Sequence, residues 1–143
     1  MKYRHLFSEG SIGKVQVRNR TVMAAMVTGW ANYDGTPSRV QSDLYEERAR
    51  NGLGLLITGA TRVDNFSGTV LPRQLSMAHD RNIAPFAALV ERMHAQGTRV
   101  FCQLHHAGGQ GMALMDLNAA CVEPVSYTHL RAHATPEHLV CRL

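Results

Sequence analysis

Apolar positions along the chain form three short runs, and two stretches with helical spacing lie between them. The runs cover residues 21–26, 53–58 and 99–104, and each has the length and composition of a buried strand. Small residues and glycines follow the runs, which predicts loops at their ends. Strand, helix, strand, helix and strand in this order form a βαβαβ unit, and the right-handed crossover rule makes its sheet parallel.

The first helix is predicted to begin after Ser38, because Ser-x-x-Gln up to Gln41 is a capping-box pattern. Asn51-Gly52 supplies its end. Three residues follow at helical spacing, Val40, Leu44 and Tyr45, and Ala49 continues this apolar face less strongly.

The second helix is predicted over residues 83–96, with Pro85 tolerated in its first turn and Gly97 ending it. Four residues form its predicted apolar face: Phe86, Leu89, Val90 and Met93. The stretch from 63 to 82 between the second strand and this helix is expected to be a long loop.

A short β-hairpin is predicted ahead of these elements. Val15 and Val17 alternate with polar residues after a turn that contains glycine, a pattern typical of a two-stranded ribbon with one packed face. Its expected role is structural, closing one end of a larger fold.

Two parallel folds fit this order of elements. A doubly wound dinucleotide fold would carry Gly-x-Gly-x-x-Gly directly after its first strand, whereas Gly52 and Gly54 come before a strand. The phosphate-binding pattern GxxxxGK[ST] does not occur either. A (β/α)₈ TIM barrel, with functional groups at the carboxyl ends of its strands, fits better.

The composition indicates a folded, reduced protein. Its 143 residues are 45% hydrophobic, with a formal charge of +4 and a pI near 9.3. Lys and Arg are scattered along the chain, which argues against a nucleic-acid or membrane surface. Three irregularly spaced cysteines make no disulfide framework, and neither a secretory signal nor an apolar run near the roughly 20 residues of a membrane span occurs. We therefore expect a cytoplasmic protein.

Candidate chemistry lies at the strand ends. Gln103 and His106 stand where the third apolar run gives way to a loop, and Gly59, Ala60 and Thr61 follow the second, leaving room for a close approach to the backbone. A carboxamide offers both a hydrogen-bond donor and an acceptor to a bound ligand. By itself this arrangement also admits a different barrel enzyme that uses Gln103 and His106 in acid–base work.

The three strand-containing stretches read NRTVMAAM, YEERARNGLGLLITGAT and VFCQLHHAGGQG. Together with the leader LFSEGSIGKVQVRNR, they resemble the amino-terminal third of the old yellow enzyme family of flavin oxidoreductases, from about Leu6 to Gly111. The resemblance implies an FMN-binding TIM barrel in which NAD(P)H reduces the flavin and the flavin passes hydride to an activated alkene.

The resemblance also implies which residues contact FMN. The backbone after the first strand would line the flavin, Ala60 would stand beside the isoalloxazine, and the Gln103 amide would pair with its pyrimidine edge. The implied cofactor-binding set is Ala24, Ala25, Met26, Val27, Ala60 and Gln103.

The chain departs from the family pattern at three positions. Ala25 stands where the family usually has Pro, Val27 where it often has Thr, Cys or His, and Gly109 where it usually has Arg. Valine donates no hydrogen bond, so the redox tuning that the resemblance attributes to position 27 is not expected here. Gly109 removes a cation near the site. The family's substrate-binding His/Asn pair has no counterpart here, and no catalytic residue is predicted within the chain.

The last residues match nothing expected of a barrel. Residues 125–143 resemble translated sequencing-adaptor DNA and are predicted not to be native protein. Four residues in this segment have spacings that a zinc site could use: His129, His133, His138 and Cys141. No paired Cys-x-x-Cys accompanies them, so no metal site is predicted.

The domain prediction is therefore residues 1–124 as the amino-terminal part of an FMN-binding TIM barrel, comprising its first three βα units after the hairpin. Such barrels need about 250 residues. We expect an FMN-dependent NAD(P)H oxidoreductase whose present chain is inactive alone. The alternatives are a truncated piece without a stable ligand and the different barrel enzyme described above.

Overall fold

The computed structural model describes residues 3–66 and 68–108. The predicted tail and its candidate zinc ligands lie outside these residues, as does the boundary at 124. The elements, in chain order, are β1 Gly10–Ile12, β2 Val15–Val17, β3 Val22–Met23, α1 Arg39–Arg50, β4 Leu55–Ile57, β5 Thr61–Arg62, the 3₁₀ turn η1 Asp80–Asn82, α2 Ile83–Ala95, β6 Arg99–Phe101 and β7 Leu104–His105.

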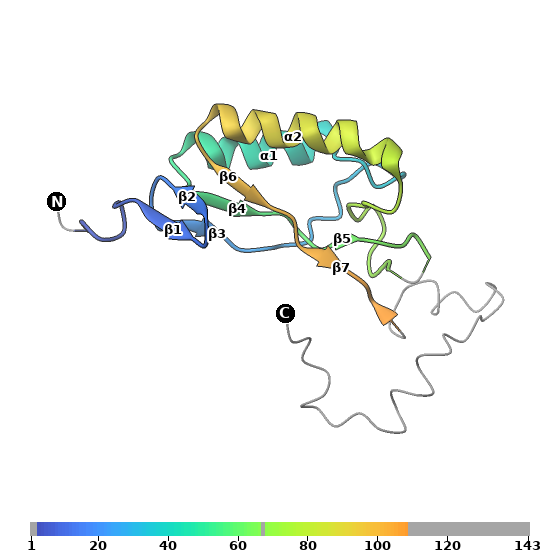
Figure 1. The fold of residues 1–143 in the computed structure, drawn as a ribbon. Helices are drawn as coiled ribbons and strands as arrows, with labels where there is room; N and C mark the ends of the chain where they lie inside the picture. Colours follow the sequence, from blue (N-terminus) through green and yellow to red (C-terminus); the bar gives the residue numbers. More distant parts are fainter. Residues whose placement is uncertain (1–2, 67, 109–143) are drawn as a thin grey trace, which may run out of the picture.

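The central sheet is parallel, as predicted, with the strand order β3-β4-β6. Leu55 of β4 pairs with Val22 of β3 on one side and with Arg99 of β6 on the other. Both helices lie on the same face of this sheet (Figure 1). The described residues therefore contain two consecutive β–α–β crossovers, the repeating unit of an α/β barrel.

The predicted hairpin is present and packs at the amino-terminal side of the sheet (Figure 1). β1 and β2 pair antiparallel, with Ile12 opposite Val15. Just after β2, Arg18 Nη2 donates to the carbonyls of Ala49 and Leu53, each at 2.9 Å. These bonds satisfy carbonyls at the end of α1 and in the connection to β4, so they fix the hairpin to the bottom of the sheet.

Helix α1 begins where the sequence predicts, and its face through Tyr45 and Ala49 is buried, but Val40 does not lie on this face. Ser38 Oγ accepts a hydrogen bond from the Gln41 backbone N–H at 3.2 Å, which is the first half of the capping box. The second half is not formed, because Gln41 Oε1 accepts no hydrogen bond within the described residues. Gln41 Nε2 instead donates to Thr28 Oγ1 at 3.3 Å. Val40, predicted to be buried, is 61% exposed, whereas Gln41 is 2% exposed. The prediction for Val40 is wrong because the polar Gln41 finds partners inside the fold.

The hydrophobic core lies between the helices and the sheet. Its buried members are Tyr45, Ala49, Leu56, Leu89 and Met93. In α2, Phe86, Leu89 and Met93 are buried as predicted, while Val90 is only partly covered. The core thus forms from one face of each helix and the helix-facing side of β4, as in a barrel wall.

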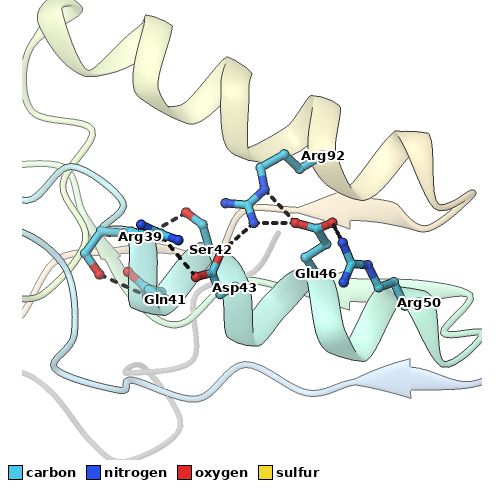
Figure 2. A network of polar contacts seen from close by, with 8 residues as sticks. Arg39, Gln41, Ser42, Asp43, Glu46, Arg50 and Arg92 are labelled. Carbon is cyan, nitrogen blue, oxygen red and sulfur yellow. Dashed lines mark hydrogen bonds and ion pairs between the residues drawn. The ribbon is translucent and has the colours of Figure 1, made fainter.

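An ion-pair network joins the two helices (Figure 2). Arg92 of α2 reaches between two carboxylates of α1, binding Asp43 Oδ1 at 2.6 Å and also Glu46. Arg50 binds Glu46 from the other side at 2.5 Å. The hydrogen bonds from Arg92 are the main reason that the pKa values of Asp43 and Glu46 lie below their usual range.

Residues 63–82 contain more structure than the predicted loop. Immediately before them, β5 pairs in parallel with β7, Thr61 opposite Leu104. The loop then returns to β5, because the Arg62 backbone N–H donates to Leu75 O at 2.9 Å and Arg62 O accepts from Met77 N at 2.8 Å. The predicted long loop is therefore present up to η1, but one isolated bridge between Arg62 and Ser76 attaches it to β5, and a partner so far away in sequence leaves no local pattern.

Candidate functional site

The tips of β3 and β4 are in backbone contact. A Cβ added to Gly59 would lie 2.3 Å from Met26 O and 3.1 Å from Val27 Cα. Glycine is required there because no other residue fits between the two tips. The glycine and small residues after the second apolar run predicted that another group lies close to this backbone. In the structure, that group is the segment after β3, at Met26 and Val27.

The tips of β4 and β6 are joined by hydrogen bonds. Thr61 N donates to Gln103 O at 2.8 Å, and Gln103 N donates to Thr58 Oγ1 at 3.3 Å. Gln103 therefore faces Gly59 and Ala60 across the gap between the strands. The structure thus brings all six predicted cofactor-binding residues onto three adjacent strand ends at the carboxyl edge of the sheet, where parallel α/β proteins bind ligands.

Several polar groups at this edge are available to a ligand. Among residues 3–66 and 68–108, no hydrogen bond is made by the backbone of residues 24–27, by the Ala60 N–H or by the Gln103 carboxamide. Ala60 is 8% exposed, so its unpaired N–H carries a substantial desolvation cost unless a ligand accepts from it. The Gln103 side chain is exposed.

These groups fit the edge of an isoalloxazine ring. Its pyrimidine side alternates C=O and N–H groups, and the site offers a carboxamide with both a donor and an acceptor, together with free backbone donors and acceptors. The segment 24–27 would contact the ring mainly through its backbone, which agrees with the absence of polar side chains there. The residues present therefore fit FMN.

The conformation around Ala60 is fixed by residues that the sequence did not single out as functional. Tyr45, read only as a core residue, accepts a hydrogen bond on its hydroxyl from Gly59 N at 3.2 Å. Gln74 Nε2 donates to Ala60 O at 3.0 Å, while Gln74 Oε1 accepts from Val70 N at 2.9 Å. Gln74 is 1% exposed, but it stands in an irregular segment, so periodicity gave no signal for its burial.

A buried arginine stands next to this turn. Arg62 is 8% exposed and donates to Asn65 Oδ1 at 2.9 Å and to Thr69 Oγ1 at 3.3 Å. Burial lowers the pKa of its guanidinium, while the charges of Asp34 and Asp64 act in the opposite direction. An arginine stays charged under these conditions, so Arg62 places a fixed positive charge in the wall behind the strand tips.

His106, the other candidate at the end of the third strand, is exposed. Its Nδ1 accepts a hydrogen bond from Gly108 N at 3.0 Å, an interaction that shapes the local turn. Gly109, the departure from the family's arginine, lies outside the described residues. Within the described part of the chain, no group of three or more His, Cys, Asp or Glu side chains could hold a metal ion. Neither α1 nor α2 has the length and hydropathy of a membrane-spanning helix.

Comparison with known proteins decides the family. The model of the NADH:flavin oxidoreductase / NADH oxidase family matches residues 5–139. The chain belongs to this family. Its members use FMN and NAD(P)H, so the fit of the strand tips to a flavin agrees with the assignment and the predicted old yellow enzyme resemblance is confirmed.

Individual members of this family are similar over most of the chain. An NADH oxidase of Thermoanaerobacter brockii is 44% identical over 108 residues, which are 76% of this chain and 17% of that protein. An NADPH dehydrogenase of Bacillus velezensis is 34% identical over 122 residues, 85% of this chain and 36% of that protein. The chain thus spans well under half the length of these flavin oxidoreductases.

Solved structures of old yellow enzymes have the same fold. The old yellow enzyme from Pichia sp. AKU4542 superposes with a TM-score of 0.69 at 27% identity, covering 75% of this chain and 28% of that one. Morphinone reductase superposes with a TM-score of 0.69 at 28% identity, covering 80% and 29%. The described residues are therefore part of a TIM barrel of the flavin oxidoreductase family.

Proposed function

We propose that the complete protein is an FMN-dependent oxidoreductase that takes hydride from NAD(P)H and delivers it to an activated alkene. The observation that carries the proposal is the meeting of three strand tips with free backbone groups and one free carboxamide. FMN, when bound, would accept hydride from the nicotinamide and pass it to the alkene.

This chain contributes to binding and orientation. The Gln103 carboxamide would hold the pyrimidine edge of the ring in one orientation, donating and accepting at once. The Ala60 N–H and the backbone of residues 24–27 would hold the remainder of that side. Because Gly59 and Ala60 carry little or no side chain, the ring can approach the turn closely.

We propose further that the chain supplies the first three βα units of the barrel and is inactive alone. The described sheet has three strands, and β3 and β6 form its edges. A closed barrel leaves no edge unpaired. Exposed apolar residues next to these edges, such as Val22 at 50% and Met26 at 56%, also require cover from the rest of a barrel.

Titration of the complete protein with FMN, followed by NAD(P)H oxidation in the presence of an enone, tests the proposal. We expect one FMN per protein and NAD(P)H consumption that depends on the enone. Gln103→Leu removes the carboxamide at similar volume, and the loss of about two neutral hydrogen bonds should weaken FMN binding about tenfold or more.

Gln16→Leu is the matched control for this variant. Gln16 is an exposed glutamine of β2 in the hairpin, at the opposite end of the sheet, so its substitution should leave FMN affinity unchanged. A complete protein that binds no FMN in this titration would refute the proposed function. Under anaerobic conditions, NAD(P)H consumption that does not increase when the enone is added would refute the alkene as the hydride acceptor.

A further inference from the structure

Three hydroxyl and amide groups connect Gln103 to the turn that carries Ala60. Gln103 N donates to Thr58 Oγ1 at 3.3 Å, Thr58 Oγ1 lies 3.3 Å from Thr61 Oγ1, and Thr61 Oγ1 donates to Gly59 O at 3.0 Å. Since Thr61 has one hydroxyl hydrogen and gives it to Gly59 O, the Thr58 hydroxyl must be the donor to Thr61. The bonds therefore run in one direction from β6 to β4.

This chain of bonds replaces the backbone ladder where the strands separate. The ladder between β4 and β6 continues to Thr58 N, which donates to Phe101 O at 2.9 Å, and it resumes where Thr61 N donates to Gln103 O. Between these two bonds, Gly59 and Ala60 turn away from the ladder. The Thr58 hydroxyl takes the place of a backbone carbonyl as acceptor for the Gln103 N–H, so that N–H stays paired.

Burial makes this hydroxyl hard to replace. Thr58 is 1% exposed and Thr61 is 0% exposed, so water does not reach either group freely. Without the Thr58 hydroxyl, the Gln103 N–H would lose its partner and the two tips could change their spacing.

We propose that Thr58 is a positioning residue for the flavin site: its hydroxyl sets the spacing and orientation of Gln103 relative to Ala60. The inference rests on the proposed function, because Ala60 and Gln103 are the two predicted ring contacts on these tips. Thr58 itself makes no predicted contact with the flavin and acts only through Gln103 and the turn that carries Ala60.

The test compares threonine variants of the complete protein in FMN affinity, flavin absorption spectrum and midpoint potential. Thr58→Val keeps the shape and removes the hydroxyl. It should weaken FMN binding about tenfold and shift both the spectrum and the potential, since hydrogen bonds at the ring tune the cofactor. Thr58→Ser restores the hydroxyl and should bring FMN affinity back to within about threefold of the wild type.

Thr98→Val is the matched control. Thr98 is equally buried, at 0% exposed, and its hydroxyl donates to Leu53 O at 2.7 Å, but at the amino end of β6. This variant should lower the melting temperature to a similar extent and leave the flavin spectrum and potential unchanged. If Thr58→Val does not fold, Thr61→Val breaks the same chain of bonds at its next member and should shift the spectrum in the same direction.

Three results would overturn the inference. Thr58→Val, or Thr61→Val in its place, could bind FMN with wild-type affinity and spectrum. Thr98→Val could shift the flavin spectrum and midpoint potential as much as Thr58→Val does, which would show that both shifts arise from general destabilisation. A wild-type protein that binds no FMN would instead remove the proposed function and this inference together.

Discussion

Gly59 is the residue whose substitution tests the meeting of the strand tips most severely. In Gly59→Ala, the new Cβ would lie 2.3 Å from Met26 O, whereas real Cβ contacts are essentially never shorter than 3.0 Å. The tips of β3 and β4 must therefore separate by about 0.7 Å or more. Binding constellations are held to within about 0.5 Å, so this displacement exceeds what the site tolerates.

The expected loss has two parts. Forcing a methyl group into a packed contact should lower the free energy of unfolding by about 1–3 kcal/mol. The displaced backbone of residues 24–27 should in addition weaken FMN binding at least tenfold, because misplacement of about 1 Å can reduce the efficiency of a site about 100-fold. Chemical unfolding measures the first effect, and FMN titration of the folded variant measures the second.

Gly54→Ala is the control that separates these effects. Its Cβ would lie 2.4 Å from Asn19 O, an equally severe clash, but at the amino end of β4. We expect the same loss of stability with unchanged FMN affinity. Equal loss of FMN from Gly54→Ala, or full FMN binding by Gly59→Ala, would refute the reasoning that the tips of β3 and β4 form one side of the flavin site.

Two further predictions concern the scaffold. The hydrogen bonds of Arg92 hold the pKa of Glu46 below its ordinary value of 4.5 and that of Asp43 below 3.8. The stabilisation by these ion pairs is therefore complete above pH 4.5 and is lost as the pH falls through the lowered folded-state pKa values. The free energy of unfolding, measured against pH at low salt, should fall in this range, and Arg92→Met should flatten this part of the curve. A curve unchanged by Arg92→Met would contradict the assignment. Met93 is 0% exposed, so Met93→Ala should lower the free energy of unfolding by about 2–5 kcal/mol; a loss below 1 kcal/mol in urea unfolding would show that the core between α2 and the sheet is not packed as described.

The helix ends could be predicted from the sequence because their signals are local. Ser38 caps the first turn of α1 through a neighbour three residues away, and Gly97, with φ at +73°, follows α2. The parallel sheet followed from the order of the elements alone. By contrast, which residues of α1 are buried depended on Thr28 and Tyr45, which give Gln41 partners inside the fold.

The sequence predicts that the six candidate residues lie at strand ends, and the structure places them there, but the construction of this edge could not be predicted from the sequence. The apolar run 21–26 predicts a longer strand than β3, which ends at Met23. Beyond this point the ladder to β4 stops, and that interruption leaves the backbone of residues 24–27 free for a ligand. Thr58 and Gln103 are 45 residues apart in sequence, so no pattern along the chain could show that one positions the other.

The most direct test of the central claim is a crystal structure of the complete protein with FMN bound. We expect the backbone of residues 24–27, the Ala60 N–H and the Gln103 carboxamide all to lie within hydrogen-bonding distance, about 2.7–3.2 Å, of the same isoalloxazine ring. A ring bound at any other edge of the sheet, or contacting only one of the three strand tips, would contradict it.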